Sequence, residues 1–204
     1  MKENRPVENL ADYLEKYKAA KELTVVGPLF EGEAKFSEPV VFVDGGSRYR
    51  TRDIGFRVGD GDSSCGELDM KLNAEKDFSD LAFVFTRVGG FFGRIRLLGF
   101  LGGRRDHELI NLAEAHSFLQ ARKSTQLSFD ERVRGYSAGE WTLQVEGLFS
   151  LFAFAEAHVK LSGACRYPIA DGTLKPLSSH GLSNVGHGEV HLACRGPVFL
   201  FFPI

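Results

Sequence analysis

The 204-residue chain has few cysteines, little net charge and no long apolar run, and each absence excludes a class of protein. Its three cysteines, Cys65, Cys165 and Cys194, are odd in number and widely spaced. This argues against a disulfide framework and for a reducing compartment, the cytoplasm. The net charge of −2 provides no overall field that would attract nucleic acid or an acidic membrane. No apolar run reaches the length of about 20 residues that a membrane span needs.

The N-terminus and the aromatic content exclude two further possibilities. Residues 1–6 (MKENRP) are charged and lack an apolar core, so they are not expected to act as a secretion signal. Only two methionines and one tryptophan accompany 18 phenylalanines. This composition indicates a rigid aromatic core rather than an adaptable binding groove.

The first part of the chain alternates apolar runs, glycine turns and helical patterns. Apolar residues at intervals of three and four predict an extra N-terminal helix at about 7–21. Ser79 and Asp106 are expected to cap two further helices. Strands are predicted at 23–26, 39–43, 56–58 and 93–100. This alternation predicts an open α/β (Rossmann-like) nucleotide-binding domain over residues 1–123, with ligands beyond the carboxyl ends of its strands.

The pattern changes after about residue 122, where short extended runs are punctuated by glycine, proline, serine and asparagine. The runs lie at 142–145, 149–154, 158–161, 189–193 and 198–202. Part of 150–158 could instead be helical. We therefore predict an all-β sandwich domain over residues 124–204.

Four acidic and glycine-rich patches follow one another over about sixty positions, each beside an apolar run. They are Asp44-Gly45-Gly46, Gly59-Asp60-Gly61-Asp62-Ser63, Asp77-Phe78-Ser79-Asp80 and Gly102-Gly103-Arg104-Arg105-Asp106-His107. Carboxylates at strand ends suit a magnesium ion that bridges phosphates. A glycine turn with an arginine lets backbone amides and a guanidinium approach phosphate oxygens. Together the patches predict an enzyme that uses a magnesium nucleotide.

Each patch also has an ordinary structural interpretation. Asp60 and Asp62 could form a solvated turn, and Asp77 could simply cap a helix. Asp106 could be an N-cap, which is compatible with a role near phosphate. Asp44 could hold a ribose hydroxyl, order its loop or form an Asx turn.

Two other groups of residues are weaker candidates. A zinc site is suggested by His180, His187, His191 and Cys194, but no close cysteine pair accompanies them, and surface or strand-packing roles are simpler. A basic cluster alternates along a segment predicted to be extended: Arg48, Arg50 and Arg52. It could face phosphate or form a solvated edge.

In these residues the chain resembles the thiamine pyrophosphokinase family from about residue 40 to the end. The family's Asp-Gly-Gly, Gly-Asp-x-Asp-Ser, Asp-x-Thr-Asp and Gly-Gly-Arg-x-Asp-His patterns match the four patches in order, with Ser79 in place of threonine. Three later segments resemble further family elements: 149–151 (FSL), 163–168 (GACRYP) and 181–184 (GLSN).

The resemblance implies ATP-dependent transfer of a pyrophosphoryl group to thiamine, which yields thiamine diphosphate and AMP, in a homodimer. The implied Mg²⁺ ligands are Asp60, Asp62, Asp77 and Asp80. The implied nucleotide and phosphate groups are Asp44, Gly45, Gly46, Gly102, Gly103, Arg104 and His107. The implied catalytic residues are Asp62, Asp80, Arg104 and Asp106, with Asp62 or Asp80 taking the hydroxyl proton. The thiamine pocket would comprise Tyr167, Ser183 and Asn184.

Departures from the family pattern leave the acceptor open. Gly61 replaces a bulkier residue between two aspartates, and the segment 47–58 is shorter than usual. The chain could therefore pyrophosphorylate another hydroxymethyl or hydroxyethyl compound, such as a pterin. It could also be a non-catalytic homologue that binds a nucleotide or thiamine, or a purely structural homodimer, although the last would leave the ordered motifs unexplained.

Overall fold

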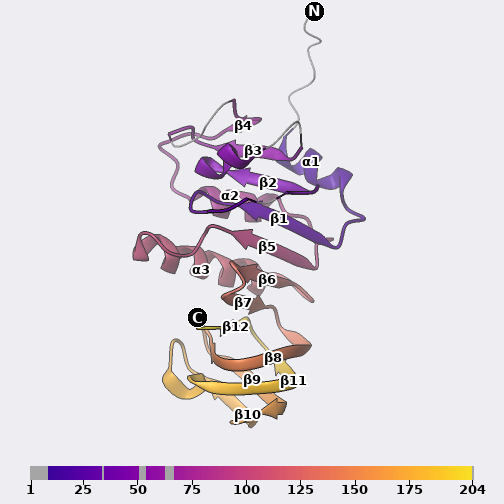
Figure 1. Cartoon of the computed structure of the whole chain (residues 1–204), viewed down its shortest axis with the longest axis vertical. Helices are drawn as coiled ribbons and strands as arrows, with labels where there is room; N and C mark the ends of the chain where they lie inside the picture. Colours follow the sequence, from indigo (N-terminus) through magenta and orange to yellow (C-terminus); the bar gives the residue numbers. More distant parts are fainter. Residues whose placement is uncertain (1–8, 34, 51–53, 63–66, 204) are drawn as a thin grey trace, which may run out of the picture. The chain divides into compact units, whose positions relative to one another are not determined.

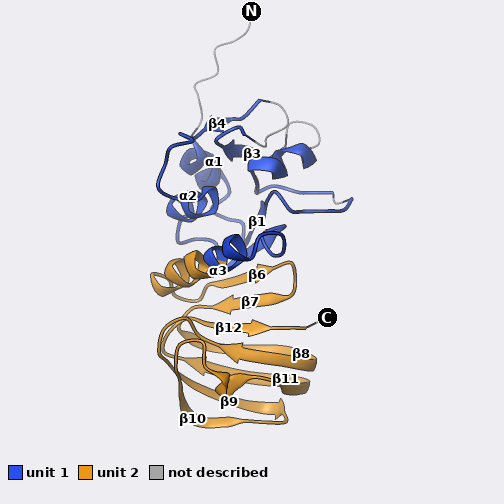
Figure 2. Cartoon of the chain, turned by 90° about the vertical axis from the view of Figure 1, so that its left-hand side faces the viewer, with its two compact units in different colours: residues 1–111 blue, residues 112–204 orange. Residues whose placement is uncertain are grey.

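A computed structural model describes residues 9–33, 35–50, 54–62 and 67–203 of the chain. The fold is mixed α/β, and the chain divides into two compact units, residues 1–111 and 112–204 (Figures 1 and 2). The predicted domain boundary between residues 123 and 124 stays a prediction. Arg52, Ser63 and Cys65, together with the first residues of the predicted N-terminal helix, lie outside the described residues.

The first unit contains a parallel sheet in the order β5-β1-β2-β3-β4. Its strands are β1 (Glu22–Val26), β2 (Val40–Val43), β3 (Phe56–Gly59), β4 (Met70–Lys71) and β5 (Arg94–Leu98). Four of these strands were predicted, and only the two-residue β4 was not. All four residues of β2 are buried, as expected for a central strand of a parallel sheet with both faces covered.

Two short helices, α1 (Leu10–Lys16) and α2 (Asp80–Arg87), lie next to each other in this unit (Figure 2). The predicted cap of α2 is confirmed, because the Ser79 hydroxyl accepts a hydrogen bond from the Ala82 N–H at 3.0 Å. Helix α1 is shorter than predicted and ends at Lys16. None of the helices in the described part of the chain is long and apolar enough to cross a membrane.

The predicted cap of the third helix was wrong. Helix α3 (Arg105–Gln120) begins one residue before Asp106, which therefore lies inside its first turn. The Asp106 carboxylate accepts two hydrogen bonds from the Arg104 guanidinium, at 3.1 and 2.5 Å. The Asp106 side chain thus binds the Arg104 guanidinium, while the Asp106 backbone is already part of the helix.

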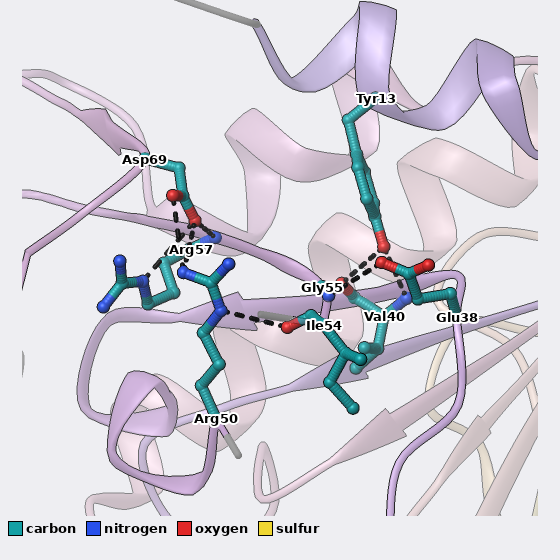
Figure 3. Close-up of polar contacts among 8 residues, drawn as sticks. All are labelled: Tyr13, Glu38, Val40, Arg50, Ile54, Gly55, Arg57 and Asp69. Atoms are coloured by element: carbon teal, nitrogen blue, oxygen red, sulfur yellow. Dashed lines mark hydrogen bonds and ion pairs between the residues drawn. The ribbon is translucent and has the colours of Figure 1, made fainter. Parts of the chain in front are cut away.

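Two polar networks fix the connection between β2 and β3 (Figure 3). The Tyr13 hydroxyl donates to the Val40 carbonyl and accepts from the Val40 N–H, both at 3.1 Å, which ties α1 to the sheet. The Glu38 carboxylate accepts from the Gly55 N–H at 3.0 Å. Glu38 precedes β2 and Gly55 precedes β3, so this bond holds the starts of the two strands together.

The second network involves the basic cluster of the same connection. The Asp69 carboxylate accepts from Arg50 at 3.2 Å and from the Arg57 N–H at 2.8 Å (Figure 3). Arg48 donates to the carbonyls of Gly45 and Pro28. The prediction of an extended segment was wrong at Arg48, because Asp44–Tyr49 forms a 3₁₀ helix, η1. Arg48 and Arg50 are thus used structurally.

The second unit is all-β apart from the end of α3 and the short helix η2 (Ser179–Gly181). Its strands run antiparallel in the order β10-β9-β11-β8-β12-β7-β6. They are β6 (Gln126–Phe129), β7 (Val133–Tyr136), β8 (Gly139–Phe152), β9 (Ala157–Cys165), β10 (Ile169–Leu174), β11 (Asn184–Cys194) and β12 (Val198–Phe201). The runs predicted at 142–145 and 149–154 belong to one strand, β8. Strands β6, β7 and β10 were not predicted, and 150–158 is not helical.

Strand β8 connects the two parts of this unit. Residues 139–149 of β8 pair with β11, and residues 150–152 pair with β12. The core is formed by buried side chains from these strands, including Phe149, Leu151, Val190 and Leu192. Strand β8 thus contributes side chains to this core along most of its length. The sandwich arrangement stays a prediction.

Gly46 provides a test of the close packing behind the turn after β2. A Cβ atom at this position would lie 2.2 Å from the Val26 carbonyl oxygen, which is backbone and cannot turn aside. We expect Gly46→Ala to lower the stability by at least about 2 kcal/mol, or roughly 5 °C in Tm, measured by thermal denaturation. The matched control is Gly196→Ala, whose new Cβ would meet no atom closer than 3.7 Å. Equal Tm values for the two variants would contradict this packing.

Candidate active site

A pocket of about 280 Å³ lies at the carboxyl ends of the parallel strands of the first unit. Its lining comes from residues that directly follow β1, β2, β3 and β5, and from the starts of α2 and α3. It contains four carboxylates and one ammonium group, contributed by Asp44, Asp60, Asp62, Asp80 and Lys76. Each predicted motif therefore contributes at least one residue to this pocket, at the edge where an open parallel sheet binds its ligands. Several predicted residues are not part of its lining: Gly45, Gly46, Asp77, Gly102, Gly103, Arg104 and Asp106.

Three of these carboxylates face one another. Oxygen atoms of Asp44, Asp60 and Asp62 all lie within 4.8 Å of one another. Asp44 adopts a positive φ of 49°, a conformation that aspartate tolerates better than most residues. Its Oδ1 atom is buried and has no hydrogen-bond partner among the described residues. Burial raises the pKa of Asp44, and the charges of Asp62, Asp80 and Asp60 raise it further. Among the described residues, the negative charge of the Asp44 carboxylate is therefore not balanced by a neighbouring positive charge.

Lys76 lies between the other acidic groups. Its Nζ atom is 3.3 Å from Asp60 Oδ2 and 3.0 Å from Asp80 Oδ1, and its side chain is only 9% exposed. Burial lowers the pKa of Lys76, but the hydrogen bonds and charges of Asp80 and Asp60 outweigh this, so the net pKa is raised. The ammonium form is therefore secured by its two carboxylate partners.

The two partners of Lys76 differ in their electrostatics. A hydrogen bond from the Asp62 N–H, at 3.1 Å, lowers the pKa of Asp60, and Lys76 contributes to the same shift. For Asp80, burial raises the pKa and outweighs the opposing effect of Lys76. Asp80 is therefore the more basic of the two carboxylates.

The glycine turn before α3 is already in contact with carboxylates. The Gly102 N–H donates to Glu108 Oε2 at 3.0 Å, and the Arg104 guanidinium is held by Asp106. This partner lowers the pKa of Asp106 to about 2, so the pair is ionised at neutral pH. The Gly102 N–H and the Arg104 guanidinium, which were predicted to bind phosphate, are thus bound to carboxylates from the first turn of α3.

The remaining predicted residues of the first unit differ in their positions. His107 lines the pocket. Asp77 is exposed and is not part of the pocket lining, and its role as a metal ligand stays a prediction. Gly45 and Gly46 are buried, and Gly46 packs against the end of β1. Gly103 has a φ of +66°, which supports the choice of glycine in this turn.

In the second unit, Asn184 supports the backbone beside Tyr167. Its side-chain oxygen accepts from the Tyr167 N–H at 3.0 Å, and its nitrogen donates to the Tyr167 carbonyl at 2.7 Å. Asn184 is buried, whereas Tyr167 is 53% exposed and Ser183 is also exposed. The amide of Asn184 is therefore already used within the protein, and the exposed groups here are Tyr167 and Ser183.

Two of the residues considered for a zinc site, His191 and Cys194, have other partners. His191 Nε2 lies 3.4 Å from Glu189 Oε1, and the buried Cys194 thiol donates to the Ser137 carbonyl. Burial raises the pKa of this thiol to about 11, which keeps it protonated. Within the part of the chain that is described, zinc binding at these residues gains no support.

Sequence reasoning missed two polar residues of the pocket, Lys76 and Asn111. Lys76 was not among the predicted site residues, although its position four residues before Asp80 at a helix start was a signal for an ion pair. Asn111 lines the pocket and donates to the Phe100 carbonyl at 2.9 Å, which ties α3 to the segment after β5. Its position four residues after His107 on one helix face was the available signal.

Comparison with solved structures identifies proteins of the same fold. Thiamine pyrophosphokinase from Bacillus subtilis is similar with a TM-score of 0.66 and 19% identity, covering 90% of this chain and 100% of that one. A thiamin pyrophosphokinase family protein from Enterococcus faecalis gives 0.67 and 18%, covering 91% and 100%. Thiamin pyrophosphokinase from Candida albicans gives 0.65 and 11%, covering 92% and 90%.

This chain has the thiamine pyrophosphokinase fold. The resemblance drawn from the sequence motifs is thereby confirmed at the level of the fold. No family model and no curated protein sequence matches the chain. The low identities fit a divergent relative of these structures.

The crowding of carboxylates around Asp44 generates a pH-dependent prediction. Because the pKa of Asp44 is raised in the folded protein, its ionisation destabilises the fold as the pH rises through that pKa. We expect Asp44→Asn to raise the Tm of the metal-free protein at about pH 7 by roughly 2–4 °C, which corresponds to about 1 kcal/mol. Most of this gain should be lost as the pH falls toward about 4.

The control for this experiment is Asp77→Asn, which removes an exposed carboxylate that does not line the pocket. Differential scanning calorimetry with a chelator present measures all three proteins. A gain for Asp44→Asn that is independent of pH would indicate relief of backbone strain instead, since asparagine also tolerates a positive φ. A lower Tm at neutral pH would show that the Asp44 charge is compensated in the metal-free protein.

Proposed function

We propose that the chain is a thiamine pyrophosphokinase, which transfers the β- and γ-phosphoryl groups of ATP to thiamine and releases AMP. The observation that carries this proposal is the meeting of Asp44, Asp60 and Asp62 within 4.8 Å of one another, in a pocket that also contains Asp80 and Lys76. Three acidic groups this close favour a divalent cation and the phosphates that it binds. The shared fold supports the same reaction class.

The residues of the pocket fit Mg²⁺. The donors are all carboxylate oxygens, which this hard cation prefers, and Asp44 Oδ1 is a buried acceptor with no partner among the described residues. Asp44, Asp60 and Asp62 would hold the ion. When bound, it would neutralise charge on the triphosphate and polarise the phosphoryl group. Asp80, which forms an ion pair with Lys76, would lie beside the ion rather than bind it directly. Asp77 remains a candidate ligand from the motif alone.

The phosphate chain would bind at the start of α3. Gly102 and Gly103 would offer backbone amides, and Arg104 a planar guanidinium, to phosphate oxygens. His107 lines the same pocket and would lie beside the chain. For the phosphates to bind these groups, the Glu108 carboxylate must give up its hydrogen bond from the Gly102 N–H. The Arg104 guanidinium must then bind both the Asp106 carboxylate and a phosphate.

The acceptor would use the exposed groups of the second unit. The ring of Tyr167 offers an aromatic face for the cationic thiazolium, and the Ser183 hydroxyl offers a polar contact. Asn184 would act by fixing the backbone of Tyr167. The proposed enzyme would be a homodimer in the cytoplasm. Each chain would comprise a Rossmann-like domain (1–123) and a β-sandwich domain (124–204).

The chemistry is a displacement at the β-phosphorus. The acceptor hydroxyl oxygen forms a bond to this phosphorus while the bond to the α,β-bridging oxygen breaks, and AMP leaves with that oxygen. The hydroxyl proton passes to a carboxylate. Asp80 suits this role better than Asp60 because burial raises its pKa, and Asp62 is the alternative acceptor.

The decisive experiment measures AMP formed from ATP and Mg²⁺ with and without thiamine. We expect thiamine-dependent AMP release from the wild type, and a loss of at least about 100-fold in Asp62→Ala. Glu31→Gln, an exposed change outside the pocket, is the control and should leave the rate unchanged. Asp77→Ala tests whether this residue belongs with the ligands.

Other outcomes separate the alternatives. AMP formed only with a different hydroxymethyl or hydroxyethyl acceptor, such as a pterin, would replace thiamine but keep the reaction. Binding of magnesium-ATP without AMP from any acceptor would indicate a non-catalytic homologue.

Glu108 provides a second prediction about nucleotide affinity. Its carboxylate lies at the Gly102 N–H, where a phosphate is proposed to bind, so it repels that phosphate. Glu108→Gln keeps the side-chain shape and removes the charge. A charge this close is worth about 1 kcal/mol in water, so we expect the KM for ATP to fall about fivefold at low ionic strength. Glu31→Gln is again the control, and an unchanged KM would show that Glu108 lies clear of the bound phosphates.

A further inference from the structure

Lys76 is the cation of the pocket, and its environment is unusual for a lysine. Its side chain is 9% exposed, and those of its partners Asp60 and Asp80 are 18% and 14% exposed. Lysine is seldom this buried unless it is paired. Here one ammonium group is shared between two carboxylates from different segments, one following β3 and one beginning α2.

Asp60 contacts two different groups of the pocket: Lys76 on one side, and the carboxylates of Asp44 and Asp62 on the other. Its Oδ2 atom is 3.3 Å from the Lys76 ammonium, and its Oδ1 atom accepts from the Asp62 N–H at 3.1 Å. Asp60 also belongs to the group of three carboxylates with Asp44. Asp60 is thus common to two acidic pairs. Lys76 bridges the pair with Asp80 through an ion pair of 3.0 Å to Asp80 Oδ1, although neither Asp80 Oδ1 nor Asp44 Oδ1 has a hydrogen-bond partner among the described residues.

The backbone before α2 fixes the lysine in this place. The Ser79 hydroxyl caps the helix through the Ala82 N–H, which makes Asp80 the first helical residue. Lys76 lies four residues before Asp80, and its buried stem carries the ammonium to both acids. A lysine suits this role because its ammonium is a compact point charge with three donors on an aliphatic stem.

We propose that Lys76 is a built-in counter-ion that takes the place of a second divalent cation between Asp60 and Asp80. Lys76 is therefore a positioning residue, which keeps the two carboxylates together in the metal-free protein. It also limits the pocket to one divalent cation, at Asp44, Asp60 and Asp62, in the absence of nucleotide. The statement on cation number rests on the proposed function, whereas the statement on counter-charge does not.

The counter-charge is tested in the full-length protein without metal. We expect Lys76→Gln to lower the Tm by at least about 5 °C in the presence of a chelator, because two partly buried carboxylates lose their shared cation. Lys76→Arg keeps the charge and should restore most of the loss. Lys175→Gln, which removes an exposed lysine of the second unit, is the matched control and should leave the Tm unchanged.

A double variant separates charge from packing. Asp80→Asn removes one of the two carboxylates, so adding it to Lys76→Gln should recover Tm if the loss arises from repulsion. If Lys76→Gln is as stable as the wild type, or if the double variant recovers nothing, the counter-ion role is overturned.

The cation number is tested with Mn²⁺ alone, followed by electron paramagnetic resonance and calorimetry. We expect the wild type and Lys175→Gln to bind one Mn²⁺ ion, and Lys76→Gln to bind two, since Asp60 and Asp80 then share no cation. The double variant with Asp80→Asn should return to one. A purely structural role of Lys76 would not change this number.

The two proposals fail in different ways. One Mn²⁺ ion in both the wild type and Lys76→Gln, with similar affinity, overturns the limit that Lys76 sets while leaving the proposed metal site in place. No Mn²⁺ binding by the wild type overturns the proposed metal site together with the cation limit, and the chelator experiment then still decides whether Lys76 is a counter-ion.

Discussion

Repulsion between carboxylates is the constraint around which the first unit is organised. The parallel strands β2 and β3 end side by side, so the acids that follow them meet, and α2 begins with another acid at the same edge. Water cannot screen these charges fully because the pocket partly buries them. The fold can hold such a group only with positive charge inside it. Lys76 supplies one charge, and a divalent ion is the natural source of the rest.

The same electrostatic logic explains the start of α3. A glycine turn and an arginine beside a helix N-terminus form a site for anions, and the nearest anions are Glu108 and Asp106 of the same helix. The protein therefore carries an internal partner for both groups: Lys76 for the acids of the pocket, and Glu108 and Asp106 for the glycine turn and Arg104. A magnesium nucleotide would satisfy both groups at once, which links its binding to the rearrangement of these internal pairs.

Much of this arrangement could be predicted from the sequence, because it follows from local rules. Strand-end acids of neighbouring parallel strands must converge, and a serine before an apolar helix is a reliable cap, so the meeting of Asp44 with Asp60 and the role of Ser79 were accessible. Helix α3 begins one residue before the predicted cap Asp106, and sequence patterns do not locate helix ends to that precision. The strands β6, β7 and β10 are short or interrupted by glycine, and tertiary pairing rather than pattern defines them.

Asn184 has a consequence for the conformational entropy of binding. Because its buried amide clamps both the N–H and the carbonyl of Tyr167, the backbone that carries this exposed ring is held before any ligand arrives. Ordering a loop on binding normally consumes part of the interaction energy, and a ring on a fixed backbone has only its two side-chain torsions left to order. A buried asparagine therefore holds the backbone of an exposed tyrosine in place, which would lower the entropy cost of any ligand that binds its ring.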